Sequence, residues 1–182
     1  MILYHTGFGE IKKPDIHFGR KNADFGQGFY LTPELSFAQR WAKERRGSLT
    51  YLNTYYLKTE GLNIKKYERS REWFEYIFAN RHLAPDNLFE FDIIIGPIAN
   101  DTIYDVLGVT TSGFLEKEEA LRLLMIGPEY TQIALKTVKA VSQLEWVSSK
   151  LLDHETILSF RDTAVKEESE YQTLFAQEML RG

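Results

Sequence analysis

The stretch Asp24-Phe25-Gly26-Gln27-Gly28-Phe29-Tyr30-Leu31 decides the fold, because it joins a loop with paired glycines to an apolar strand. Glycine adopts the backbone conformations that tight turns need, so we expect Gly26 and Gly28 to form a loop that leads directly into the strand. Thr32 and Pro33 follow at once, and an N-cap residue before proline is typical of a helix start. The stretch therefore predicts a loop, a strand and a helix in that order.

The spacing of apolar residues predicts further strands and helices on both sides of this stretch. Strands are expected at residues 2–5, 52–58, 91–98, 131–136 and 145–149. Helices are expected after Thr32 with Gly47 closing the helix, after Ser70, at residues 116–125, and from Asp153 almost to the end of the chain. The sequence thus predicts an α+β fold with flanking helices and a C-terminal helix.

The composition is that of an ordinary globular protein with one substantial core. The chain has 182 residues, of which 43% are hydrophobic and 26% are charged. Its net charge of -4 gives no general attraction to nucleic acid or to an anionic membrane, although it leaves room for a local basic patch. The absence of cysteine excludes disulfides, thiolate zinc sites and a cysteine nucleophile.

Two further absences bear on location. The first five residues lack the charged and then apolar run of a signal peptide. The longest apolar run, at residues 93–95, is ended by Gly96 and Pro97 and is far too short to span a bilayer. We therefore expect a cytoplasmic protein that does not enter a membrane.

Two short motifs carry the chemistry, and their order and spacing matter more than any single residue. The first is Leu3-Tyr4-His5-Thr6-Gly7, and the second is the stretch 25–30, about twenty residues later. Together they resemble the ADP-ribosyltransferase superfamily, in the branch shared by diphtheria toxin and the poly-ADP-ribose polymerases. His5 matches the family histidine, Gly26 and Gly28 match its paired glycines, and Tyr30 matches its motif tyrosine.

The resemblance implies a split β-sheet core that binds NAD⁺ as a substrate. It implies that His5 holds the adenosine ribose and that backbone near Thr6 and Gly7 binds the carboxamide, although glycine follows the histidine directly in the family. Trp41 stands eleven residues after Tyr30, where the polymerases have a second tyrosine against the nicotinamide. Nicotinamide in NAD⁺ is a cation, so two aromatic faces attract it, by about 2 kcal/mol when water is excluded.

The third motif of the family is a glutamate at the start of a later strand, where it contacts the nicotinamide ribose. The matching strand here is 131–135, which places Gln132 at that position, with Glu129 as the alternative if the strand begins earlier. A neutral glutamine loses the charge-assisted hydrogen bond of a carboxylate, which corresponds to about a tenfold lower rate. Residues 91–99 and 131–140 also resemble a bacterial subfamily of this superfamily that is catalogued as a domain of unknown function, and Asp101 follows the first of these segments.

The resulting hypothesis is a mono-ADP-ribosyltransferase with His5, Tyr30 and Gln132 as its catalytic residues and no metal. The alternatives are an NAD⁺ glycohydrolase and a catalytically weak module that binds NAD⁺, ADP-ribose or a partner protein. The resemblance also implies a bacterial toxin or a member of a toxin–antitoxin pair. We expect the domain at residues 1–150 and a C-terminal helix at 151–182 that packs on it or contacts an antitoxin or a second copy. The acceptor macromolecule stays open, with the loop at 109–116 as the segment expected to select it.

Overall fold

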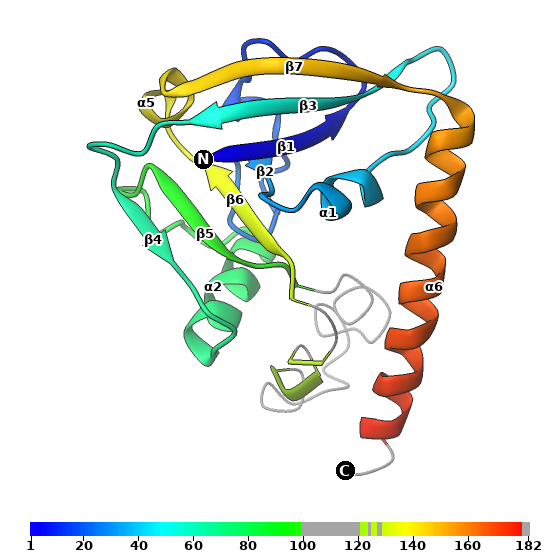
Figure 1. Cartoon of the computed structure of the whole chain (residues 1–182). Coiled ribbons are helices and arrows are strands. Elements are labelled where there is room, and N and C mark those ends of the chain that lie inside the picture. The colour runs from blue at the N-terminus through cyan, green and yellow to red at the C-terminus, as the bar shows by residue number, and fades with distance from the viewer. Residues whose placement is uncertain (100–120, 124, 127–128, 180–182) are drawn as a thin grey trace.

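The computed structural model describes residues 1–99, 121–123, 125–126 and 129–179, and these form an α+β fold on two β-sheets (Figure 1). The first sheet has the strand order β1-β3-β7 and the second the order β2-β6-β5-β4. The strands are β1 (Ile2–Gly7), β2 (Phe29–Leu31), β3 (Thr50–Leu57), β4 (Ile64–Lys66), β5 (Ile93–Pro97), β6 (Thr131–Leu135) and β7 (Leu144–Leu152). The helices are η1, a 3₁₀ turn (Ile16–Phe18), α1 (Leu35–Arg40), α2 (Arg71–Arg81), α5 (Val138–Ser142) and α6 (His154–Met179).

Strand pairing brings the end of β1 beside β2, although the two strands belong to different sheets. β1 pairs antiparallel with β3, and His5 lies opposite Asn53. β2 pairs antiparallel with β6, while β4 runs parallel to β5. Tyr4 and Thr32 then exchange two backbone hydrogen bonds, of 2.8 and 3.0 Å, which join the sheets at one point. The fold is therefore split beside the two motifs that the sequence singles out.

The main core lies between the two sheets, and a second core lies under α2. Leu3 and Tyr55 of the first sheet pack against Leu31 and Ile133 of the second. On the other side of the second sheet, aromatic and aliphatic residues of α2 cover Ile94 and Ala134; these residues are Trp73, Phe74 and Ile77. Burial of these apolar surfaces is the main force that holds the sheets and helices together.

Most of the predicted elements are confirmed, including two helix starts. Ser70 accepts a hydrogen bond of 3.2 Å from the backbone nitrogen of Trp73 at the start of α2. Asp153 accepts one of 2.7 Å from Thr156 at the start of α6. The short strand β4 was not predicted, because its three residues give no period long enough to recognise.

The helix predicted to start at Thr32 is wrong at both ends. Thr32 stays extended because its backbone is bonded to Tyr4, and α1 begins only at Leu35. The helix ends at Arg40, and Gly47 instead occupies a turn with a φ of +77°, beside the bridge between Arg45 and Ser48. Trp41 is therefore the C-cap residue of α1 and does not lie inside a longer helix.

The C-terminal helix α6 runs along one side of the molecule (Figure 1). Its side chains Ile157 and Tyr171 are buried, and Glu167 forms an ion pair with Arg40 of α1. In the described ranges no helix combines the length and the apolar character needed to cross a bilayer. Asp101, the acceptor loop at 109–116 and most of the helix predicted at 116–125 lie outside the described residues.

Candidate functional site

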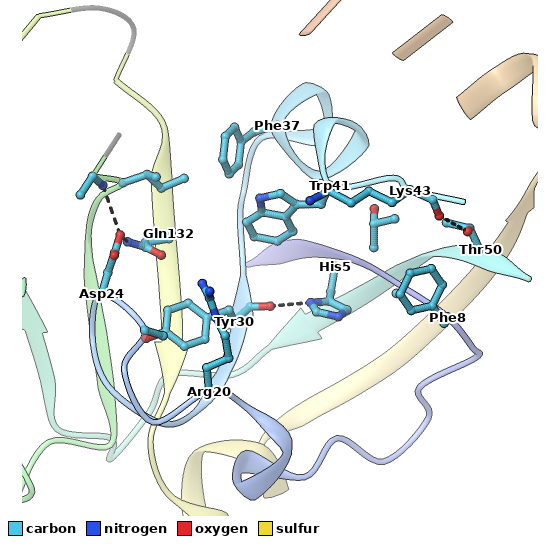
Figure 2. Close-up of a pocket in the computed structure, with 15 residues that line it drawn as sticks. His5, Phe8, Arg20, Asp24, Tyr30, Phe37, Trp41, Lys43, Thr50 and Gln132 are labelled. Carbon is cyan, nitrogen blue, oxygen red and sulfur yellow. Dashed lines mark hydrogen bonds between the residues drawn. The ribbon is translucent and has the colours of Figure 1, made fainter. Parts of the chain in front are cut away.

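A cleft of about 390 Å³ opens beside the split between the sheets (Figure 2). It is lined from β1, β2, β3, α1 and β6, from the loop before β2, and from the segments that follow β1, α1 and β5. Its volume falls in the range of small-molecule sites, and aromatic side chains with a few polar groups are the usual lining of such sites. Of the predicted site residues, the cleft brings together six: His5, Thr6, Gly7, Tyr30, Trp41 and Gln132.

His5 stands at the back of the cleft with one ring nitrogen already occupied. Its Nδ1 lies 2.7 Å from the carbonyl oxygen of Tyr30. Burial lowers the pKa of His5, and the hydrogen bond to Tyr30 opposes this shift only in part. The ring is therefore neutral at pH 7, with its proton on Nδ1, because a carbonyl can only accept. The free nitrogen, Nε2, is then an acceptor.

Thr6 and Gly7 lie on either side of this arrangement. The Thr6 hydroxyl donates a buried hydrogen bond of 2.6 Å to the carbonyl of Ala38, so it fixes β1 to α1. Gly7 packs against the imidazole, and a Cβ at this position would lie 3.2 Å from Nε2 of His5. A side chain at Gly7 would thus press on the nitrogen that is left for a ligand.

Tyr30 presents its ring to the cleft while its hydroxyl closes the glycine loop. The hydroxyl donates to the carbonyl of Gly26 at 2.7 Å and accepts from the backbone nitrogen of Phe25 at 2.9 Å. Burial, and then the negative charge of Asp24, raise the pKa of Tyr30 well above its ordinary value. The phenol therefore stays protonated, and its role in the loop is that of a fixed donor and acceptor.

Gly26 and Gly28 lie behind Tyr30 and are not among the residues that line the cleft. Gly26 has a φ of +70° and lines a second cavity, of about 510 Å³, on the far side of the loop. At Gly28 a Cβ would lie 2.7 Å from the carbonyl oxygen of Leu135, while a Cβ at Gly19 would lie 2.2 Å from that of Gly28. The glycines thus allow close backbone packing that sets the position of Tyr30.

Trp41 and Phe37 form an aromatic wall on the α1 side. The Trp41 ring lies edge-on to Phe37 with centroids 5.1 Å apart, and 6.1 Å from the His5 ring. Phe37 stacks in turn on Tyr130, at 4.6 Å. Figure 2 shows the three rings around the cleft, with Trp41 above, Tyr30 at the lower left and His5 at the lower right.

Gln132 lines the cleft, whereas Glu129 does not. β6 begins at Thr131, so Gln132 lies within the strand and is only 5% exposed, whereas Glu129 lies outside the strand and is exposed. The amide nitrogen of Gln132 donates a hydrogen bond of 2.8 Å to a carboxylate oxygen of Asp24. Within the described part of the chain, its amide oxygen has no hydrogen-bond donor.

Asp24 was missed by the sequence reasoning, although it is the most connected residue of the site. Its carboxylate is 7% exposed and pairs with Arg81, whose Nη2 lies 2.6 Å away. It also accepts from Gln132 and from the backbone nitrogen of Ala99. The signal that points to Asp24 is its place next to the Phe-Gly motif, but Arg81 is too distant in sequence to be recognised as its partner.

Two cations at the cleft were also missed. Arg20 and Lys43 line the cleft and are exposed, and neither forms an ion pair within the described ranges. Figure 2 shows Arg20 beside the Tyr30 ring and Lys43 beyond Trp41. No group of three or more histidine, aspartate or glutamate side chains in the described part of the chain could hold a metal ion.

The described residues form an α+β fold with an aromatic and polar cleft beside the split between its two sheets. The chain belongs to a family described as protein of unknown function (DUF3990), which matches residues 1–146. The match includes the cleft residues from His5 to Gln132 and leaves out most of β7 and all of α6. No curated protein and no solved structure matches the chain.

Proposed function

We propose that this protein is a mono-ADP-ribosyltransferase that moves ADP-ribose from NAD⁺ to a macromolecular acceptor. The observation that carries the proposal is the convergence of His5, Tyr30, Trp41 and Gln132, from four separate parts of the chain, on one cleft. These are the positions for which the sequence motifs resemble the ADP-ribosyltransferase superfamily. A sheet split beside the cleft agrees with the core that this resemblance implies.

Tyr30 and Trp41 would hold the nicotinamide ring between them. Their aromatic faces attract the pyridinium cation, and the attraction disappears when nicotinamide leaves as a neutral molecule. The half-buried position of both rings keeps water from one side of this subsite. Arg20 and Lys43, which line the same cleft and form no ion pair with the described residues, would bind the diphosphate.

His5 and Gln132 would bind the two riboses as acceptors. The His5 tautomer leaves Nε2 free to accept from a hydroxyl of the adenosine ribose. Because Gln132 gives its amide N–H to Asp24, its oxygen is left to accept from a hydroxyl of the nicotinamide ribose. Asp24 is a positioning residue in this scheme, since it acts through Gln132.

A catalytically weak binding module is the second candidate, and one observation favours it. Gln132 is neutral, and the carboxylate behind it is already paired with Arg81. The charge available to stabilise an oxocarbenium-like transition state is therefore smaller than that of a free glutamate. The same cleft would then bind NAD⁺ or ADP-ribose with little turnover.

The resemblance further supports a bacterial toxin, or a member of a toxin–antitoxin pair, acting in the cytoplasm. The exposed Leu158 and Val165, which are seven positions apart on one side of α6, offer a surface for an antitoxin or a second copy. Truncation after Asp153 tests how α6 is used. A folded product of altered oligomeric mass would indicate a partner contact, whereas an insoluble product would indicate that α6 belongs to the core.

The test of the proposed function is turnover of NAD⁺ labelled in its adenylate, with and without cell lysate. His5→Ala and Tyr30→Ala are compared with Tyr56→Ala, which removes an exposed tyrosine of β3 away from the cleft. We expect wild type and the Tyr56→Ala control to transfer the label to a macromolecule, and both cleft variants to lose this activity. Nicotinamide release without a labelled product would indicate a glycohydrolase. Binding without turnover would indicate the binding module, and the absence of binding would overturn the proposal.

A further inference from the structure

Two segments of the chain continue outward from residues that line the cleft, and we define them together as the outer rim: residues 8–18, and residues 45 and 46. Phe8 lines the cleft at one end of the first segment, and Arg20 lines it just beyond the other end. The second segment follows Lys43, which also lines the cleft. An acceptor that approaches the bound NAD⁺ from the side of Phe8 and Lys43 would pass this rim or lie along it.

The rim presents available positive charge, although the chain as a whole has a net charge of -4. Lys13, Arg45 and Arg46 are exposed and form no ion pair within the described residues. Within the rim four cationic side chains, Lys12, Lys13, Arg45 and Arg46, outnumber the two carboxylates of Glu10 and Asp15. Glu10 pairs with Lys12 at 3.2 Å, and Glu44, next to the rim, contacts His154 at 2.6 Å. The rim is thus a local basic patch of the kind that the overall charge conceals.

Aromatic rings are interleaved with these charges. Phe18 is 92% exposed and Phe8 is 47% exposed, which leaves large apolar faces in water. The guanidinium of Arg45 lies 5.6 Å from the centre of the Phe8 ring. The segment around Phe18 is fixed, because the amide of Gln27 donates to the carbonyls of His17 and Gly19 at 2.8 and 3.1 Å.

We propose that the outer rim binds single-stranded nucleic acid, and that this is the acceptor of the ADP-ribose. Exposed aromatic rings are stacking platforms for bases, and nearby cations are contacts for phosphates. A single strand fits because its bases are free to stack and to enter the cleft, whereas those of a duplex are not. The inference rests on the proposed function of the cleft.

The transfer step balances without any further reagent. The bond between the ribose C1 carbon and the nicotinamide nitrogen breaks, and its electron pair leaves with nicotinamide, which becomes neutral. A lone pair on an oxygen or nitrogen of the acceptor strand forms the new bond to that carbon, and the proton of the acceptor group goes to water. No oxidant or metal enters the step.

The experiment measures binding by fluorescence anisotropy, using a labelled strand of about 15 nucleotides as DNA and as RNA. Arg45→Glu and Phe18→Ala are compared with matched controls away from the cleft: Lys66→Glu on β4, and Phe89→Ala, which removes another exposed phenylalanine. We expect about tenfold weaker binding in each rim variant, and none of this loss in the controls. For wild type, log K should fall with log salt at a slope of about -2 for three phosphate contacts.

A parallel reaction with adenylate-labelled NAD⁺ separates this inference from the proposed function. Label should appear on the nucleic-acid strand, and parallel reactions with DNA and with RNA show which of the two is the acceptor. Arg45→Glu should reduce the labelling of the strand while NAD⁺ binding is unchanged. Three results, each with normal NAD⁺ binding, would overturn the inference and leave the proposed transferase function intact. They are the absence of strand binding, strand binding by the rim variants equal to that of their controls, and label on protein alone. Absence of NAD⁺ binding in wild type would instead remove the proposed function.

Discussion

The amide nitrogen of Gln132 lies 2.8 Å from the carboxylate of Asp24, and this contact determines which end of the amide faces the cleft. A glutamine side chain has a donor end and an acceptor end of almost equal shape. Because Asp24 accepts the hydrogen bond, the oxygen of Gln132 is the end left for a ligand. Arg81 keeps the network neutral by pairing with Asp24.

Gln132→Glu is therefore expected to destabilise the protein, although it introduces the residue that the resemblance leads one to expect. Two buried carboxylates in contact cannot both be ionised, so the pair would hold a proton in the folded state at neutral pH. The folded pKa is then raised above the unfolded one, so stability is lost as the pH rises. We expect a loss of about 1–3 kcal/mol in urea unfolding, smaller at about pH 5 than at about pH 8.

The double variant Asp24→Asn with Gln132→Glu exchanges the amide and the carboxylate, so that position 24 becomes the hydrogen-bond donor and position 132 the acceptor. It should recover part of the lost free energy of unfolding and give faster NAD⁺ turnover than either single variant. Asp162→Asn, an exposed aspartate on α6, is the control for the amide substitution. Additive losses in the double variant would contradict a direct hydrogen bond between the two positions.

His5 should make the stability of the protein depend on pH. Burial lowers its folded pKa below the unfolded value of 6.5, so the unfolded chain binds the proton more readily. The stabilisation is complete above pH 6.5 and is lost as the pH falls from there through the folded pKa. Urea unfolding of wild type and His5→Gln over this window measures it, because glutamine cannot take up the proton.

The difference between the free energies of unfolding of wild type and His5→Gln should narrow steadily as the pH falls. A constant difference would mean that His5 titrates alike in the folded and unfolded chains. NAD⁺ binding should weaken over the same window, since a protonated Nε2 no longer accepts a hydrogen bond.

Local signals predicted much of the fold, and long-range contacts account for what they missed. The capping residues Ser70 and Asp153 mark real helix starts, because capping depends on residues three positions apart. Thr32 carries the same signal and begins no helix, since its backbone is bonded to Tyr4 from another strand. Tertiary pairing of that kind leaves no trace in the local pattern.

The candidate site shows the same division. His5 and Tyr30 belong to compact motifs, and the structure places both on one cleft. Asp24 has its partners at Arg81, Ala99 and Gln132, which only the folded chain brings together. Its importance is a property of burial, because a carboxylate without water needs several partners, and burial is not visible in a single sequence.

Gly26→Ala should show how the glycine loop supports the cleft. An alanine there must adopt a φ of +70°, and its Cβ would lie 2.9 Å from Nζ of Lys136 and 3.0 Å from Oδ1 of Asn80. Gly47→Ala is a matched control, since its φ is +77° and no atom lies within 4 Å of the added Cβ. The control should cost about 1 kcal/mol for backbone strain alone.

The loss in free energy of unfolding should be larger for Gly26→Ala, and the excess over the control measures the crowding. Gly26→Ala should also weaken NAD⁺ binding, because the Tyr30 hydroxyl donates a hydrogen bond to the Gly26 carbonyl. Calorimetric binding and urea unfolding of both variants give the two quantities. Equal losses and unchanged binding would show that the loop does not position Tyr30.

Tyr171→Phe should leave the protein as stable or make it more so, by up to about 1 kcal/mol. Tyr171 of α6 is 4% exposed and packs in the core that also supports Tyr30, yet its buried hydroxyl has no hydrogen-bond partner in the described part of the chain. Burial raises its pKa to about 12, so the hydroxyl remains protonated at neutral pH and is desolvated without compensation. Tyr55→Phe is the matched control, because the buried hydroxyl of Tyr55 donates a hydrogen bond of 2.7 Å to the carbonyl of Ile11. Removing this hydroxyl should cost about 1 kcal/mol of stability. Thermal and urea unfolding should therefore show a loss of stability in Tyr55→Phe and none in Tyr171→Phe. An equal loss in both variants would mean that the Tyr171 hydroxyl is hydrogen-bonded in the folded protein.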